Sequence, residues 1–242
     1  MYRRRFVAPP DKIALKDLPR EALQRLLPSS GKAKYRAEQV FRWIHQRDAA
    51  DFDAMTNLAK VTREELKRTA TITRFAPVHE DRADDGTTKY LFEMVDGSKI
   101  EAVWIPGVDE SEDAPAVTLS ERSESKGPKG RVTDDENGSK RSSADETNYR
   151  VTLCISTQAG CAMGCTFCHT GTMKLVRNLR TAEIVEQVLA VQRLHPERKI
   201  TNLVLMGMGE PLHNYDNVVA ALRILLDDLG MNFSHKRVTV ST

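Results

Sequence analysis

The chain has 242 residues, of which 40% are apolar and 29% are charged, and its formal net charge at pH 7 is +2. This composition is typical of a soluble globular protein, and no apolar stretch reaches the roughly 18 residues that a membrane span needs. The basic start at Arg3 to Arg5 lacks the apolar segment of a secretory signal, and the few cysteines are bunched, so we expect a cytoplasmic protein without a membrane anchor.

Residues 1–78 are predicted to form a small helical domain, because apolar side chains recur there at helical spacing. Asp17 is placed to cap a first helix that ends at Pro28. A second apolar stripe runs from Tyr35 to Ile44, and the capping-box pattern of Thr62 to Glu65 predicts the start of a third helix. Core packing alone accounts for these apolar side chains.

A β-hairpin is expected next, within residues 79–106. Two strands at 87–95 and 99–105 flank Asp96-Gly97, a dipeptide that favours a tight turn. The composition then changes at residues 107–148, where Ser, Asp, Glu, Lys, Gly and Pro dominate. Such a segment buries too little apolar surface to offset the entropy of ordering it, so we predict a disordered insertion.

Residues 149–242 show the alternation of an α/β fold. Three strands alternate with two helices, and the expected elements are 151–156, a helix from Thr181, 200–206, 217–229 and 237–241. This order implies a parallel sheet or barrel with right-handed crossovers. Three strands cannot close a barrel, so we expect only the first half of one, with the remaining strands outside this sequence.

Three cysteines in the run Cys161-x-x-x-Cys165-x-x-Cys168 are the most informative motif of the chain. An iron–sulfur cubane is usually closed by four cysteines, so three would leave one iron open to bind a substrate molecule. A structural zinc site completed by His169 or Cys154 is the alternative. The loop follows the first strand of the α/β unit, where parallel folds place their active sites, and this favours the catalytic interpretation.

Other candidate residues each have an ordinary explanation beside the functional one. Gly207 to Pro211 follow the next strand, where Glu210 could accept hydrogen bonds from an ammonium group, although a tight strand exit needs glycine too. Ser241, at the end of the third strand, likewise has both a functional and an ordinary explanation. Cys154 lies on the polar face of its strand, where an inert buried cysteine is common. Glu101, in the second strand of the hairpin, is most simply explained as an ordinary solvent-facing carboxylate.

The three-cysteine motif, followed two strands later by Gly-Glu-Pro, resembles the radical S-adenosylmethionine (radical SAM) enzymes. Longer stretches are similar to one family among them, the RlmN family of dual-specificity adenine-carbon-2 RNA methyltransferases. The stretches that carry this likeness are 35–44, 55–58, 100–106, 156–161, 177–179, 206–212 and 237–242. The resemblance covers nearly the whole chain except 107–148, and it makes residues 1–78 an RNA-binding type of domain.

The resemblance implies a set of functional residues. The ligands of a [4Fe–4S] cluster, whose open iron would bind S-adenosylmethionine, would be Cys161, Cys165 and Cys168. The residues that hold this cofactor would be Gly209, Glu210 and Ser241. Glu101 would be the general base, and Cys154 would form a disulfide bond with a second cysteine near the carboxyl terminus.

The resemblance also implies the reaction and its partners. Carbon 2 of an adenosine in 23S ribosomal RNA, and of the adenosine 3′ of the anticodon in transfer RNA, would be methylated through a methylated cysteine, with a low-potential electron donor and a monomeric enzyme. No cysteine follows Cys168, so the methyl-carrying cysteine is expected outside this sequence and the chain alone is expected not to complete the transfer. The alternatives are methylation of carbon 8 by a related enzyme, a zinc-stapled RNA-binding module without catalysis, and a fragment that does not fold because its edge strands are open.

Overall fold

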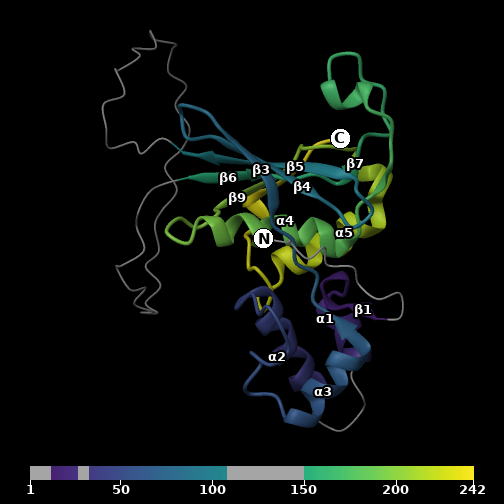
Figure 1. The fold of residues 1–242 in the computed structure, drawn as a ribbon, viewed down its shortest axis with the longest axis vertical. Coiled ribbons are helices and arrows are strands. Elements are labelled where there is room, and N and C mark those ends of the chain that lie inside the picture. The colour runs from purple at the N-terminus through teal and green to yellow at the C-terminus, as the bar shows by residue number, and fades with distance from the viewer. Residues whose placement is uncertain (1–11, 27–32, 108–149) are drawn as a thin grey trace, which may run out of the picture.

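In a computed structural model, residues 12–26, 33–107 and 150–242 are described. The basic start of the chain, Pro28 and the predicted disordered insertion lie outside these ranges, apart from Gly107. Within them, none of the helices is long and apolar enough to cross a membrane. The described chain forms a helical module and a mixed β-sheet covered on one face by two helices (Figure 1).

The helical module packs three helices around an apolar core. Its elements are β1 (Ile13–Ala14), a 3₁₀ turn (Leu15–Asp17), α1 (Arg20–Leu26), α2 (Ala33–His45), α3 (Lys60–Thr69) and β2 (Ala70–Thr71), with β1 and β2 pairing in parallel. Val40, Phe41 and Ile44 of α2 are fully buried, as their spacing predicts.

Two of the predicted caps in this module are wrong. Helix α1 starts at Arg20, after Pro19, and Asp17 ends the preceding 3₁₀ turn instead of capping α1. Helix α3 starts at Lys60 without a side-chain cap, two residues before the Thr62 that the capping-box pattern favoured. The carbonyl of Pro19 accepts from the backbone nitrogens of Ala22 and Leu23 and so starts α1, and the start of α3 differs by two residues from the predicted one.

The sheet has six strands in the order β10-β9-β6-β5-β4-β3. The predicted hairpin is confirmed, because β4 (Thr88–Glu93) and β5 (Lys99–Pro106) pair in antiparallel fashion around the turn at Gly97. The sequence did not indicate β3 (Pro77–Arg82), an exposed edge strand that pairs with β4. The parallel part consists of β6 (Val151–Cys154), β9 (Asn202–Leu205) and β10 (Val238–Val240), as expected from the βαβαβ order.

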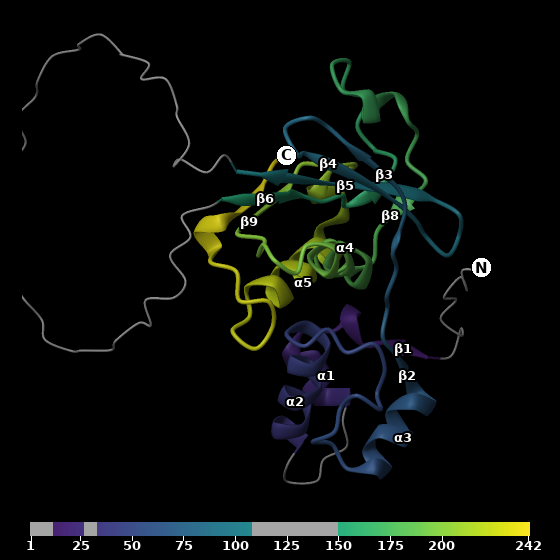
Figure 2. The ribbon, with the colours of Figure 1, turned by 60° about the vertical axis from the view of Figure 1, so that its left-hand side comes forward.

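Two helices cover one face of the sheet and leave the other to the functional loops. Helices α4 (Thr181–Leu194) and α5 (Tyr215–Leu226) pack their apolar sides against that face, where Leu153, Ile155 and Leu203 are buried. The loop that carries the three cysteines rises from the other side of the sheet, and the helical module lies beyond α4 and α5 (Figures 1 and 2). A short ribbon of β7 (Gln158–Ala159) and β8 (Arg177–Asn178) closes the base of this loop.

A buried charge cluster joins the helical module to α4. The ammonium group of Lys16 is fully buried and forms an ion pair with the equally buried carboxylate of Glu186. Arg193 of α4 also reaches Glu186 and donates to both carboxylate oxygens of Asp48, at 2.9 and 2.8 Å. Each buried charge therefore has an opposite charge beside it, as burial in a medium of low dielectric constant requires.

Candidate active site at the carboxyl ends of the parallel strands

The candidate residues gather where the three parallel strands end. The cysteine loop follows β6, the Gly-Glu-Pro loop follows β9, and Ser241 follows β10 directly. Since β6, β9 and β10 are neighbours with the same direction, their carboxyl ends lie side by side at one edge of the sheet. The antiparallel strand β5, which carries Glu101, borders the same edge through its pairing with β6.

The cysteine loop is an exposed excursion between β7 and β8. Cys161, Cys165 and Cys168 are partly exposed and carry free thiols. The backbone nitrogen of Cys168 donates to the carbonyl of Cys165 at 3.2 Å, and Gly171 donates to the carbonyl of Cys168 at 3.0 Å, so the chain turns back on itself here. Hydrogen bonds from Gly171 and Thr170 lower the pKa of the Cys168 thiol, which favours the thiolate form that binds metals.

The cysteine loop offers three thiols as donors to a metal centre. Among residues 12–26, 33–107 and 150–242, no three His, Cys, Asp or Glu side chains converge on a point where one metal ion could sit. The zinc alternative therefore has no preformed site in the described chain. A cubane takes its cysteine thiolates on different irons, so three thiols match the number of protein ligands of a cluster with one open iron.

The Gly-Glu-Pro loop is held tightly against the start of the cysteine loop. Its backbone bonds to residues 155–158, with Gly207 donating to Ile155 and the carbonyl of Met208 accepting from Thr157 at 2.8 Å. Gly209 has a φ of +101°, and a Cβ built on it would lie only 2.4 Å from Cβ of Gln158. Glycine is thus required by the packing of two loops, and not only by a tight exit from the strand.

Glu210 is fixed at three points beside this contact. Its backbone nitrogen donates to Oε1 of Gln158 at 2.9 Å, and its carboxylate accepts from the backbone nitrogen of Leu212 at 2.9 Å. The carboxylate oxygen of Glu210 that accepts from Leu212, Oε1, also accepts from the hydroxyl of Thr242 at 2.7 Å. The structure therefore brings Glu210 next to the segment that follows β10, where Ser241 lies exposed to solvent.

Glu101 and Cys154 lie on the face of the sheet opposite α4 and α5. Val103 pairs with Cys154, and alternation along β5 puts Glu101 on the same face as Val103. The Glu101 carboxylate lies 3.5 Å from Nζ of Lys89 and is 38% exposed. Burial raises the pKa of the Cys154 thiol, while a hydrogen bond from the backbone of Met206 opposes that shift.

The structure contains no disulfide bond between Cys154 and the other cysteines of this chain. All four cysteines of the chain lie in the described residues, and all four are free thiols. The other three belong to the exposed loop beyond β7, whereas Cys154 lies within a strand of the sheet, so none of them is placed to pair with it. The cysteines of this chain therefore do not support the predicted disulfide bond.

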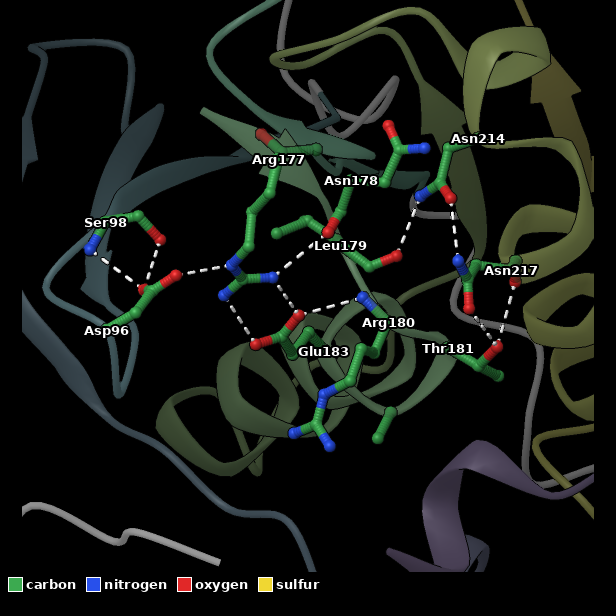
Figure 3. A network of polar contacts seen from close by, with 12 residues as sticks. Asp96, Ser98, Arg177, Asn178, Leu179, Arg180, Thr181, Glu183, Asn214 and Asn217 are labelled. Atoms are coloured by element: carbon green, nitrogen blue, oxygen red, sulfur yellow. Dashed lines mark hydrogen bonds and ion pairs between the residues drawn. The ribbon is translucent and has the colours of Figure 1, made fainter. Parts of the chain in front are cut away.

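Arg177 is a further residue of the site that the sequence did not single out as functional. Its guanidinium group donates to both carboxylate oxygens of Glu183, at 2.7 and 2.9 Å, and Nε donates to Asp96 in the hairpin turn (Figure 3). The hydrogen bond from Arg177 holds the pKa of the Asp96 carboxyl well below its usual range. Arg177 thus joins the hairpin, the base of the cysteine loop and the start of α4.

Two family models match the chain. Residues 13–72 match the ribosomal RNA large subunit methyltransferase N-terminal domain, and residues 155–242 match the radical SAM superfamily. The first match falls on the helical module, and the second begins at the end of β6 and includes the cysteine loop and the Gly-Glu-Pro loop. Each model therefore coincides with a part of the fold described above.

Relatives of known name match along almost the whole chain. Proteins named dual-specificity RNA methyltransferase RlmN are similar to it in Pelobacter propionicus (44% identity, 96% of this chain and 54% of the relative) and in Geobacter sulfurreducens (45% identity, 95% and 52%). A crystal structure of a radical SAM methyltransferase from Sphaerobacter thermophilus is similar with a TM-score of 0.69 and 39% identity, over 95% of this chain and 57% of that one. The chain spans about half the length of the curated relatives it matches.

Proposed function

Because this chain belongs, over the residues it spans, to the RlmN family of radical SAM methyltransferases, we propose that its protein methylates carbon 2 of adenosine in RNA. Adenosines of 23S ribosomal RNA and of transfer RNA, 3′ of the anticodon, are the proposed substrates. The names of the relatives support an RNA methyltransferase with two kinds of substrate. We further propose a monomeric cytoplasmic enzyme that receives electrons from a low-potential donor.

The observation that carries this proposal is the meeting of the cysteine loop and the Gly-Glu-Pro loop at the carboxyl ends of β6 and β9. Radical SAM enzymes use a [4Fe–4S] cluster together with S-adenosylmethionine. When bound, the cluster supplies the electron that cleaves this cofactor to a carbon radical. The residues proposed to hold the cluster are Cys161, Cys165 and Cys168. The residues proposed to hold S-adenosylmethionine are Gly209, Glu210 and Ser241.

Two residues on the open face of the sheet are proposed to act on the RNA. Glu101 would accept the proton that leaves carbon 2, and its partly exposed carboxylate is accessible to a ligand on that face. Cys154 would attack the sulfur of the methyl-carrying cysteine, so that a sulfur–sulfur bond forms as the bond between that cysteine and the RNA breaks, and it lies on the same face of the sheet as Glu101. The helices α1, α2 and α3 of the proposed RNA-binding domain lie beyond α4 and α5, so the RNA would have to extend around them (Figure 2).

The experiment that tests this function has two readouts. A protein that contains this chain together with the methyl-carrying cysteine expected outside it is reconstituted anaerobically with iron and sulfide, reduced, and given S-adenosylmethionine with an RNA transcript that contains the substrate adenosine. The expected results are 5′-deoxyadenosine in the reaction mixture and 2-methyladenosine in the digested RNA, both detected by mass spectrometry. Finding 8-methyladenosine would assign the related carbon-8 reaction instead, and an absence of 5′-deoxyadenosine would refute radical chemistry.

A further inference from the structure

Gln158 is a fully buried side chain that lies between the two loops of the candidate site. Its carbonyl oxygen Oε1 accepts from the backbone nitrogen of Glu210 at 2.9 Å and from the backbone nitrogen of Ala162 at 3.3 Å. Ala162 follows Cys161 directly. One oxygen atom therefore joins the residue proposed to bind S-adenosylmethionine to the start of the loop proposed to bind the cluster.

The amide nitrogen of Gln158 is held just as firmly. Nε2 donates to Oδ1 of Asn178 at 2.7 Å and lies 3.0 Å from Nδ1 of His213. Because Oε1 faces two backbone donors, the orientation of the amide is fixed, and Nδ1 of His213 must be the acceptor. Asn178 in turn donates to the carbonyl of His213 at 3.1 Å, which closes the network.

We propose that Gln158 is a positioning residue that sets the distance between the cluster loop and the site for S-adenosylmethionine. The inference rests on the proposed function, because it takes Cys161 as a cluster ligand and Glu210 as a cofactor ligand. Both lie in loops, and the Gln158 side chain accepts from the backbone of Glu210 and from that of Ala162, the residue after Cys161. The close approach of Gly209 to Gln158 fixes the same geometry from the other side.

The chemistry of the amide explains why glutamine suits this position. Two backbone N–H groups need an acceptor, while Asn178 and His213 present acceptors that need a donor, and one amide group meets both needs. Methionine would fill a similar volume but would leave the two N–H groups without a partner. Glutamate would retain the acceptors for Glu210 and Ala162 but would lose the donor to Asn178.

The test compares Gln158→Met and Gln158→Glu with a matched control. Gln192→Met is the control, because the amide of Gln192, like that of Gln158, joins backbone groups of separate residues: it donates to the carbonyls of His195 and Arg198 at 2.8 and 3.0 Å, and it accepts from Ile200 at 2.9 Å. It lies at the opposite end of α4 from the site. Iron content and the dissociation constant of S-adenosylmethionine are measured on each reconstituted protein, together with the change in the EPR spectrum on its addition.

For Gln158→Met we expect about four irons per chain, an at least tenfold weaker affinity for S-adenosylmethionine and an altered EPR response. Gln158→Glu is expected to fall between Gln158→Met and the wild type, and Gln192→Met to stay within twofold of the wild type. If Gln158→Met loses iron while Gln158→Glu retains it, the proposal is also supported, because the cluster loop has then lost its anchor.

An affinity of Gln158→Met within twofold of the wild type would overturn the proposal, as would equal losses in Gln158→Met and Gln192→Met. A failure of the proposed function has a different signature. In that case the wild-type protein itself would bind no cluster or no S-adenosylmethionine.

Discussion

The carboxylate of Asp17 accepts a hydrogen bond from the backbone nitrogen of Ala182, 2.7 Å away and 165 residues further along the chain. Asp17 therefore caps the amino terminus of α4, the helix that follows the cysteine loop, and not the helix next to it in sequence. Glu183 provides a second cap by accepting from the backbone nitrogen of Arg180 at 2.8 Å. The helical module and the radical SAM part are joined at the helix that supports the site.

Replacing Asp17 tests this long-range cap. We expect Asp17→Ala to lower the free energy of unfolding by about 0.5–2 kcal/mol, the usual cost of losing a cap. Asp17→Asn keeps an acceptor for Ala182 and is expected to cost clearly less. Urea denaturation followed by circular dichroism measures both. Equal losses in the two variants would show that the hydrogen bond to Ala182 is not what stabilises this contact.

The buried carboxylate of Glu186 should be among the most sensitive positions of the chain. It accepts from Lys16, Arg193 and the backbone nitrogen of Phe75, so Glu186→Ala removes the nearer carboxylate from the buried Lys16 ammonium group and leaves only Asp48, 3.8 Å away, as its ion-pair partner. The expected loss in the free energy of unfolding is about 3–5 kcal/mol.

The exposed pair of Glu64 and Lys67 provides the control for Glu186. Glu64→Ala is expected to change the free energy of unfolding by less than about 1 kcal/mol in the same urea titration, since exposed ion pairs contribute little. The account of the buried cluster would be contradicted by a loss in Glu186→Ala as small as that in Glu64→Ala.

The ion pair of Asp96 and Arg177 predicts a pH dependence with a definite sign. The hydrogen bond from Arg177 lowers the pKa of Asp96 below 3.8, so the unfolded chain takes up this proton at a higher pH than the folded chain does. The stabilisation is therefore fully present above pH 3.8 and is lost as the pH falls below that value. We expect the difference in the free energy of unfolding between the wild type and Asp96→Asn to decrease as the pH falls below 3.8.

Measurements of unfolding at several pH values between about 6 and 3, a range that includes the ordinary pKa of Asp, test the Asp96 prediction. The wild type and Asp96→Asn must both be measured, because other carboxylates titrate in the same range. Their contributions cancel when the free energies of unfolding of the two proteins are subtracted. A wild-type advantage that stays constant or grows on acidification would show that Asp96 is not held in its ionised form by Arg177.

Gly209 should not tolerate a side chain. With a φ of +101° and a Cβ position 2.4 Å from Gln158, Gly209→Ala strains both the backbone and the loop contact. We expect a loss of more than about 1 kcal/mol in the free energy of unfolding. Gly164→Ala is the control, because no atom lies within 4 Å of the position that a Cβ would occupy at Gly164. Equal thermal stability of the two variants would contradict the described packing of the Gly-Glu-Pro loop.

Much of the fold could be predicted from the sequence, because apolar runs and turn residues report on local structure. The strands around Leu153 and Leu203 and the hairpin turn at Gly97 were predicted in this way and are confirmed. Strand β3 was missed, since His79 to Arg82 are polar and exposed and show no apolar alternation. The cap provided by Asp17 was misassigned because a capping pattern reveals an acceptor but not the helix it serves.

The candidate site, too, could be predicted only in part from the sequence. Cysteine spacing and the Gly-Glu-Pro motif indicated which loops meet, since both follow parallel strands. Gln158 and Arg177 were not singled out, because their roles depend on partners that the fold brings together from separate segments. Only their occurrence in the stretches 156–161 and 177–179, which resemble the family, gave a signal.

The central claim is that the cysteine loop holds a [4Fe–4S] cluster whose fourth iron is open. The most direct measurement is the iron and sulfide content of the anaerobically reconstituted wild type, Cys161→Ala and Cys154→Ala. The account predicts about four irons and four sulfides per chain in the wild type and in Cys154→Ala, and a loss of the cluster in Cys161→Ala. A colourless wild type with one zinc, or a loss of iron in Cys154→Ala equal to that in Cys161→Ala, would contradict it.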